Sequence, residues 1–245
     1  MESEVVVALL AITGLLLAGI VKGATGLGYA SCALPFLVLG FGLKSAMAIV
    51  ILPAMATNIS VSLLAGNFKE TLARFKWLYV AIFPGVAIGV MLLQWVSQPA
   101  AVKLLGVVLI LYVGLALAQP ELFLPPTLHR ILQIPTGLLN GVITGLTGAQ
   151  VMPLFPYVLA LHLDPARTVQ VVNIAVLIST FFLGIGLHLS GILTPRLLLL
   201  SAAATIPAVL GTIVGNRIRA QIPAAQFRRI VLATLLLVGV LMLLR

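Results

Sequence analysis

One stretch of this sequence occurs twice: GIVKGATG at residues 19–26 reappears 122 residues later as GVITGLTG at residues 141–148. Three shorter matches follow in the same order, with a slowly rising offset: FPGV at 83–86 with IPAV at 206–209, PAA at 99–101 with PAA at 223–225, and VG at 113–114 with VG at 238–239. Colinear matches of this kind indicate an internal duplication. The sequence therefore predicts two homologous halves, residues 1–118 and 131–245, joined by a linker at 119–130.

The composition is that of a polytopic helical membrane protein. Of the 245 residues, 62% are hydrophobic and only 8% are charged, and the mean hydropathy is +1.25. A soluble domain carries about a quarter charged residues, so this chain has too little polar surface to cover a water-soluble globule. The composition excludes a soluble enzyme, a secreted disulfide scaffold and a disordered chain. The fold class expected is all-α.

The charged residues divide the chain into apolar runs, because a charge at the centre of a lipid-facing helix costs several kcal/mol. The longest run, residues 131–163, exceeds the roughly 20 residues that one spanning helix needs, and glycines and prolines interrupt it. Splitting this run gives ten helical segments, which we interpret as eight spans plus broken or re-entrant helices.

The basic residues predict that the two halves are inverted. In the first half they gather at 69–76, between the third and fourth segments, and in the second half they gather one loop later, at 217–229. The positive-inside rule places both clusters in the cytoplasm, so equivalent loops face opposite sides of the membrane. Both termini are then expected outside the cell.

An inverted repeat is the usual construction of secondary transporters, whose sites lie where broken helices of both halves meet. In each motif copy, glycine permits a tight turn and threonine can cap the helix that follows. Two helix N-termini facing each other would form an anion cradle, because their free N–H groups carry partial positive charge. The alternative is that the glycines only allow close helix packing, as small residues at this spacing often do in membranes.

Lys22 has two interpretations. If the first two segments form a hairpin that dips into the membrane, Lys22 lies near the site and attracts the anion, and if both segments span fully it is a cytoplasmic anchor. Polar residues within spans serve either as ligands or as interhelical hydrogen-bond partners. The substrate-binding residues expected are Lys22, Gly23, Thr25, Gly26, Gly28, Asn58, Gly145, Thr147, Gly148, Gln150 and Asn173.

Acidic residues are scarce and lie outside the predicted spans: Glu2, Glu4, Glu70, Glu121 and Asp164 are expected in termini or loops. No span therefore contains a carboxylate of the kind that carries protons or binds sodium in many coupled transporters. An anion leaving a cell that is negative inside is driven out by about 2.3 kcal/mol per charge per 100 mV. We therefore expect anion efflux without carboxylate-based coupling.

Other chemistry is not indicated by the sequence. Nucleophile–base sets, HExxH and P-loops are missing, no Cys or His cluster has metal-ligand spacing, and the single Cys32 is expected to be a packing residue. We therefore expect no enzyme activity, no metal and no cofactor. The partners expected are a small anion and membrane lipid, with a homodimer left open. Nucleic acid is not expected, because the basic residues are spread among loops.

The motifs resemble those of the sulfite exporter TauE/SafE family of bacterial membrane permeases. The resemblance lies in Gly23-Ala-Thr-Gly26-Leu-Gly28 followed by Pro35, and in the second copy at 141–148 followed by Pro153 and Pro156. It implies a multi-pass protein of the cytoplasmic membrane that exports sulfite, an organosulfonate such as sulfoacetate, or a related sulfur anion. Two alternatives stay open: a passive anion channel, and a membrane assembly subunit that transports nothing.

Overall fold

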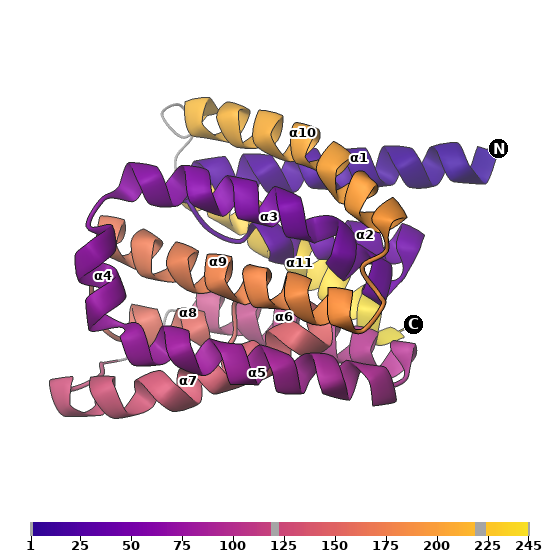
Figure 1. The fold of residues 1–245 in the computed structure, drawn as a ribbon. Helices are drawn as coiled ribbons and strands as arrows, with labels where there is room; N and C mark the ends of the chain where they lie inside the picture. The colour runs from indigo at the N-terminus through magenta and orange to yellow at the C-terminus, as the bar shows by residue number, and fades with distance from the viewer. Residues whose placement is uncertain (1, 119–122, 219–223, 245) are drawn as a thin grey trace.

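The computed structural model describes residues 2–118, 123–218 and 224–244, with side chains for 7–63, 66–118, 123–125, 127–218 and 232–244. Within these residues the chain forms only helices and the loops between them (Figure 1). The eleven helices are α1 (Glu2–Thr25), α2 (Tyr29–Phe41), α3 (Leu43–Ala65), α4 (Phe68–Arg74), α5 (Lys76–Trp95), α6 (Gln98–Ala118), α7 (Pro126–Thr147), α8 (Leu154–Leu159), α9 (Pro165–Leu189), α10 (Pro195–Ile218) and α11 (Ala224–Leu244).

The all-helical membrane fold is confirmed. Six helices in the described residues are long and apolar enough to cross a membrane: α1, α3, α5, α6, α9 and α10. Large hydrophobic side chains are exposed on the outer faces, including Leu63, Trp95 and Ile206, as expected of a surface that faces lipid. At 1.5 Å per residue, the 13 residues of α2 and the six of α8 are too short to cross a bilayer core of about 30 Å.

The helices agree in part with the segments predicted from the charged residues. The run at 131–163 is broken as expected, because α7 ends at Thr147 and α8 begins at Leu154. About ten segments are expected and the described residues form eleven helices, since the basic loop after α3 contains α4, a seven-residue helix too short to give a periodic pattern. Residues 126–130 of the predicted linker are helical, and its residues 119–122 lie outside the described residues.

Corresponding helices of the two halves run in opposite directions (Figure 1). α3 runs toward α4 at one end of the molecule, whereas α9 starts at that end and runs away from it. α5 starts at the α4 end, and α10 runs back toward it. The start of α1 and the end of α11 both lie toward the opposite end, apart from each other (Figure 1). This arrangement agrees with an inverted repeat.

Glycines bring α1 against α10 at backbone distance. A Cβ added to Gly19 would collide with Ala208 O, and one added to Gly23 would collide with Thr212 O. From the other side, Gly211 and Gly215 of α10 pack against the backbone of α1. Only glycine leaves room for this contact. We call this glycine-mediated contact between two helix backbones a seam. It joins a helix of the first half to a helix of the second.

The same kind of seam joins α5 to α7. Gly85 and Gly89 of α5 lie against backbone carbonyls of α7, while Gly141 and Gly145 lie against the backbone of α5. The packing interpretation of the glycines at the start and middle of both motif copies is therefore confirmed. Each motif helix packs on a helix from the opposite half, so the two halves are interlocked.

Six basic residues in the described part of the chain lie in helix turns at the α4 end (Figure 1), whereas Lys44, Lys103 and Arg196 lie in helix turns at the opposite end. By the positive-inside rule the α4 end is the one expected in the cytoplasm. The six residues are Lys69 and Arg74 in α4, Lys76 at the start of α5, Arg130 and Arg167 in the first turns of α7 and α9, and Arg217 in the last turn of α10. The predicted cytoplasmic Arg219, Arg228 and Arg229, and Arg245 at the other end, lie outside the described side chains.

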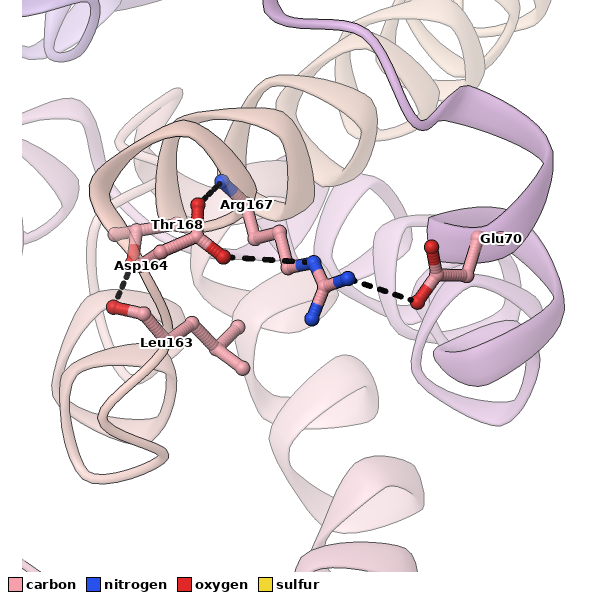
Figure 2. Close-up of polar contacts among 5 residues, drawn as sticks. All are labelled: Glu70, Leu163, Asp164, Arg167 and Thr168. Carbon is pink, nitrogen blue, oxygen red and sulfur yellow. Dashed lines mark hydrogen bonds and ion pairs between the residues drawn. The ribbon is translucent and has the colours of Figure 1, made fainter.

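Figure 2 shows an ion-pair network at this end, which joins α4 to α9. Arg167 lies between two carboxylates, with Nη2 3.4 Å from Oε1 of Glu70 and Nε 3.4 Å from Oδ2 of Asp164. Asp164 also accepts a hydrogen bond of 3.0 Å from the backbone N–H of Arg167 and so caps α9. Glu70, expected in a loop, lies in α4.

We expect Gly141→Ala to lower the stability of the protein by about 1–3 kcal/mol, because the new methyl group would lie 2.5 Å from the carbonyl oxygen of Ile82. Gly114→Ala in α6 is the matched control, since an added Cβ there meets nothing within 4 Å. Thermal unfolding in detergent measures both. Equal melting temperatures for the two variants would contradict the backbone seam.

Asp164→Ala should destabilise the protein more than Glu70→Gln does. The first change removes a helix cap, which costs about 1 kcal/mol. The second removes an exposed ion pair, which contributes less than about 1 kcal/mol and is screened by salt. Melting temperatures at low salt and at about 1 M salt should show that the Glu70 effect largely disappears, whereas the Asp164 effect keeps the part that comes from the helix cap. A Glu70→Gln loss that is larger and independent of salt would contradict this ranking.

Candidate functional site

Both motif copies end a helix in the same way. Thr25 Oγ1 donates a hydrogen bond to Val21 O (2.8 Å) and accepts one from the Leu27 N–H (3.1 Å). Thr147 Oγ1 donates to Ile143 O (2.7 Å) and accepts from the Ala149 N–H (3.1 Å). The prediction that threonine caps the following helix is therefore wrong. The hydroxyl belongs to the helix that precedes it and fixes the turn that leaves that helix.

Glycines with positive φ complete the two turns. Gly26 has a φ of 77° and Gly148 a φ of 74°, a left-handed region that favours glycine. In the first copy a further left-handed glycine, Gly28, forms the N-cap of α2 without a side-chain cap. The second copy leads through a longer loop to α8, whose N-cap is Pro153. The two copies therefore match up to the turn and differ beyond it.

Lys22 lies one turn before the end of α1 and is only 2% exposed. Its Nζ donates to Oδ1 of Asn58 in α3 (2.7 Å) and to Oδ1 of Asn173 in α9. Asn173 in turn donates to Gly26 O (2.9 Å) and ties α9 to the motif turn. The buried position rules out the interpretation of Lys22 as a solvent-exposed anchor.

The Lys22 ammonium group has amide partners but no carboxylate partner in the described part of the chain. The described carboxylates, Glu70 and Asp164, are both engaged with Arg167. A charge buried without a counterion is costly, because amide dipoles replace only part of its hydration. The arrangement therefore favours an anion at Lys22.

Lys22 lines a small cavity together with the first turn of α2. The cavity holds about 20 Å³, space for about one water molecule. Residues 28–31 form one wall, and the first helical hydrogen bond of α2 runs from Cys32 N–H to Gly28 O. The N–H groups of residues 29–31 therefore have no partner within the helix. Such groups are suited to an oxyanion.

Gln150 from the second half closes the cavity on another side. Its Nε2 donates to Oγ1 of Thr180 (2.9 Å), while its Oε1 is buried without a hydrogen-bond partner. Thr180 stands 122 residues after Asn58, which is the offset that relates the two motifs. Only the α3 and α9 members of the two contacts correspond, because the same offset pairs Lys22 with Thr144 and Gln150 with Gly28.

A larger pocket of about 280 Å³ adjoins the cavity. The two share Leu27, Gly28, Ser31, Tyr112 and Phe155 as lining residues. The rings of Tyr112 in α6 and Phe155 in α8 touch edge to face, with centroids 5.5 Å apart. These two rings therefore stand where the cavity meets the pocket.

The structure brings part of the predicted set together. Lys22, Gly28, Asn58 and Gln150 line the cavity, Thr25 lines the adjoining pocket, and Asn173 and Gly26 contact each other beside Lys22. The remaining four lie elsewhere: Gly23 and Gly145 in the helix seams, and Thr147 and Gly148 in the second turn, where Gly148 packs against Leu34 and Met47. Substrate binding by these eleven residues stays a prediction.

Sequence reasoning missed several residues that line the cavity: Tyr29, Ser31, Tyr112 and Phe155. Thr180, the hydrogen-bond partner of Gln150, could have been found because it stands 122 residues after Asn58. Nothing in the sequence distinguishes Tyr112 from an aromatic side chain in ordinary core packing. No group of three or more His, Cys, Asp or Glu side chains that could hold a metal lies within the described residues.

Asn173→Ala should cost about 2–3 kcal/mol, because it removes hydrogen bonds to the Lys22 ammonium group, Gly26 O and Val169 O within a buried site. Asn216→Ala, at an exposed position near the end of α10, should change stability by less than about 0.5 kcal/mol. Thermal unfolding in detergent compares them. Similar small shifts for both would mean that Asn173 does not hold the site together.

Comparison with known proteins gives one family. The family model described as Sulfite exporter TauE/SafE matches residues 10–242. No curated protein and no solved structure gives a match. The match covers nearly the whole chain, including both motif copies and every residue of the cavity. The chain therefore belongs to the sulfite exporter TauE/SafE family of membrane permeases.

Proposed function

We propose that this protein exports a small sulfur-containing anion, sulfite or an organosulfonate such as sulfoacetate, across the bacterial cytoplasmic membrane by alternating access. The family is one of transporters for sulfur anions, and the protein is a multi-pass membrane protein. The observation that carries the proposal is the buried Lys22 ammonium group, which has two amide partners and no carboxylate partner in the described residues.

The proposed anion binds between Lys22 and the start of α2. The ammonium group supplies the charge, and the N–H groups of residues 29–31 supply hydrogen bonds together with the partial positive charge of the helix end. The Gln150 amide nitrogen is already bonded to Thr180, so Gln150 helps to shape the cavity. Binding would offset the cost of burying the Lys22 charge.

The small volume of the cavity supports a transporter over a channel. Residues of both halves surround it, and its volume admits about one water. A sulfite ion has four heavy atoms and needs more room. We propose that the cavity widens toward the adjoining pocket as Tyr112 and Phe155 separate. Opening and closing of this kind would expose the anion to one side of the membrane at a time.

The membrane potential is the proposed driving force. The carboxylates of the described side chains lie at the α4 end, outside the six long spans, so a carboxylate-bound coupling ion has no site within those spans. An anion moving outward gains about 2.3 kcal/mol per charge per 100 mV. Export therefore needs no second ion.

The experiment is efflux of radiolabelled sulfite from proteoliposomes that contain the purified protein. The proposal predicts saturable efflux that increases with a potential negative inside the vesicles. Asn58→Asp should reduce efflux at least about tenfold, because its carboxylate would pair with Lys22 in place of the anion.

Asn216→Asp is the matched control, since it adds the same charge at an exposed position and should leave efflux unchanged. Wild-type rates in Asn58→Asp would contradict binding at Lys22. Efflux that rises linearly with concentration would instead indicate a channel.

A further inference from the structure

A second polar pocket lies at the α4 end of the molecule and is separate from the Lys22 cavity. It holds about 510 Å³ between the α4–α5 junction and the first turns of α7. Its polar and aromatic lining residues are Arg74, Lys76, Trp77, His129, Arg130 and Gln133. It shares none of these with the cavity that contains Lys22.

The pocket is strongly positive. Arg74, Lys76 and Arg130 each contribute a full charge, and no described carboxylate pairs with them. Glu70 lies one turn before Arg74 in the same helix, but its carboxylate is directed toward Arg167 of α9 (Figure 2). Arg74 and Lys76 instead lie over the rings of their neighbours Phe75 and Trp77, at 5.7 and 5.2 Å. Three cations with no carboxylate partner among the described residues attract a ligand with phosphate-like negative charge.

Buried hydrogen bonds hold the walls of the pocket in place. Gln133, only 1% exposed, donates to Arg74 O (3.1 Å) and accepts from the Leu78 N–H (3.3 Å), which fixes α7 against the start of α5. His129 Nδ1 shares a hydrogen bond of 2.8 Å with the Tyr157 hydroxyl of α8. The pocket is therefore a preformed feature of the helix packing.

Exposed apolar side chains continue from the pocket along the same two helices. On α5 these are Trp77 and Val80, at 51% and 62% exposed, and on α7 they are Ile131 and Ile134, at 67% and 52%. A tryptophan beside basic groups at the end of spanning helices is typical of the membrane–water interface. A ligand here meets cations at one end and a lipid-facing surface at the other.

We propose that this pocket binds the headgroup of an anionic phospholipid. The phosphodiester would lie among Arg74, Lys76 and Arg130, and the acyl chains would lie along Val80 and Ile134. Free phosphate has the same charge chemistry, but it would make no use of the adjoining apolar surface. The lipid would clamp the α4–α5 junction to α7 at the end expected in the cytoplasm.

The test measures melting temperatures of the delipidated full-length protein in detergent, with added phosphatidylglycerol or with phosphatidylcholine of the same acyl chains. Phosphatidylglycerol should raise the melting temperature more than phosphatidylcholine does, because only the occupied folded state gains from binding. Arg74→Gln combined with Arg130→Gln should weaken the apparent affinity for phosphatidylglycerol at least about tenfold. Lys103→Gln combined with Arg196→Gln, which removes two exposed charges at the other end, should leave it unchanged.

Native mass spectrometry of retained lipid gives a second readout, and Lys76→Gln alone serves if the double variant does not fold. A lipid preference that survives loss of the pocket charges would overturn the proposal. Inorganic phosphate that reproduces the whole shift at equal concentration would also overturn it in favour of a free-phosphate site.

Discussion

The arrangement of the protein depends on one buried charge. Lys22 enters the helix packing near the end of α1 and meets Asn58 of α3 and Asn173 of α9. Asparagine oxygens orient the ammonium group without neutralising it, whereas an aspartate in either place would close a salt bridge and remove the need for a ligand. The positive start of α2 faces the same cavity. The protein thus has a buried positive site, which in the proposed function an anion completes.

The glycine seams explain how the chain keeps such a site in place. α1 is held to α10 and α5 to α7 at backbone distance, so each half is fastened to the other at two lines of contact. α3 and α9 supply the amides, and the short α2 and α8 stop partway, which leaves room for the cavity and the adjoining pocket. The backbone contacts position Lys22, and the proposed opening assigns the movement to the short helices with Tyr112 and Phe155.

Much of this could be predicted from the sequence because it rests on composition and on the repeated motif. The helical membrane fold, the break after Thr147 and the choice of Lys22, Asn58 and Gln150 as candidates, which the structure places around one cavity, follow from charges, glycines and polar residues in apolar runs. The direction of the threonine bonds could not be predicted, since a hydroxyl can serve the helix before it or the helix after it. The partners of the motif glycines and the roles of Tyr112 and Phe155 depend on tertiary packing, which no local pattern encodes.

The most direct test of the central claim is calorimetric titration of sulfite into the detergent-purified protein, with Lys22→Met and Lys103→Met compared after both are shown to be folded. Methionine keeps most of the length of lysine and removes its charge. Lys103 is the control because it is exposed, near the start of α6. The account predicts that sulfite binds the wild type and Lys103→Met equally, and Lys22→Met at least about tenfold more weakly. Equal binding to all three proteins would contradict it.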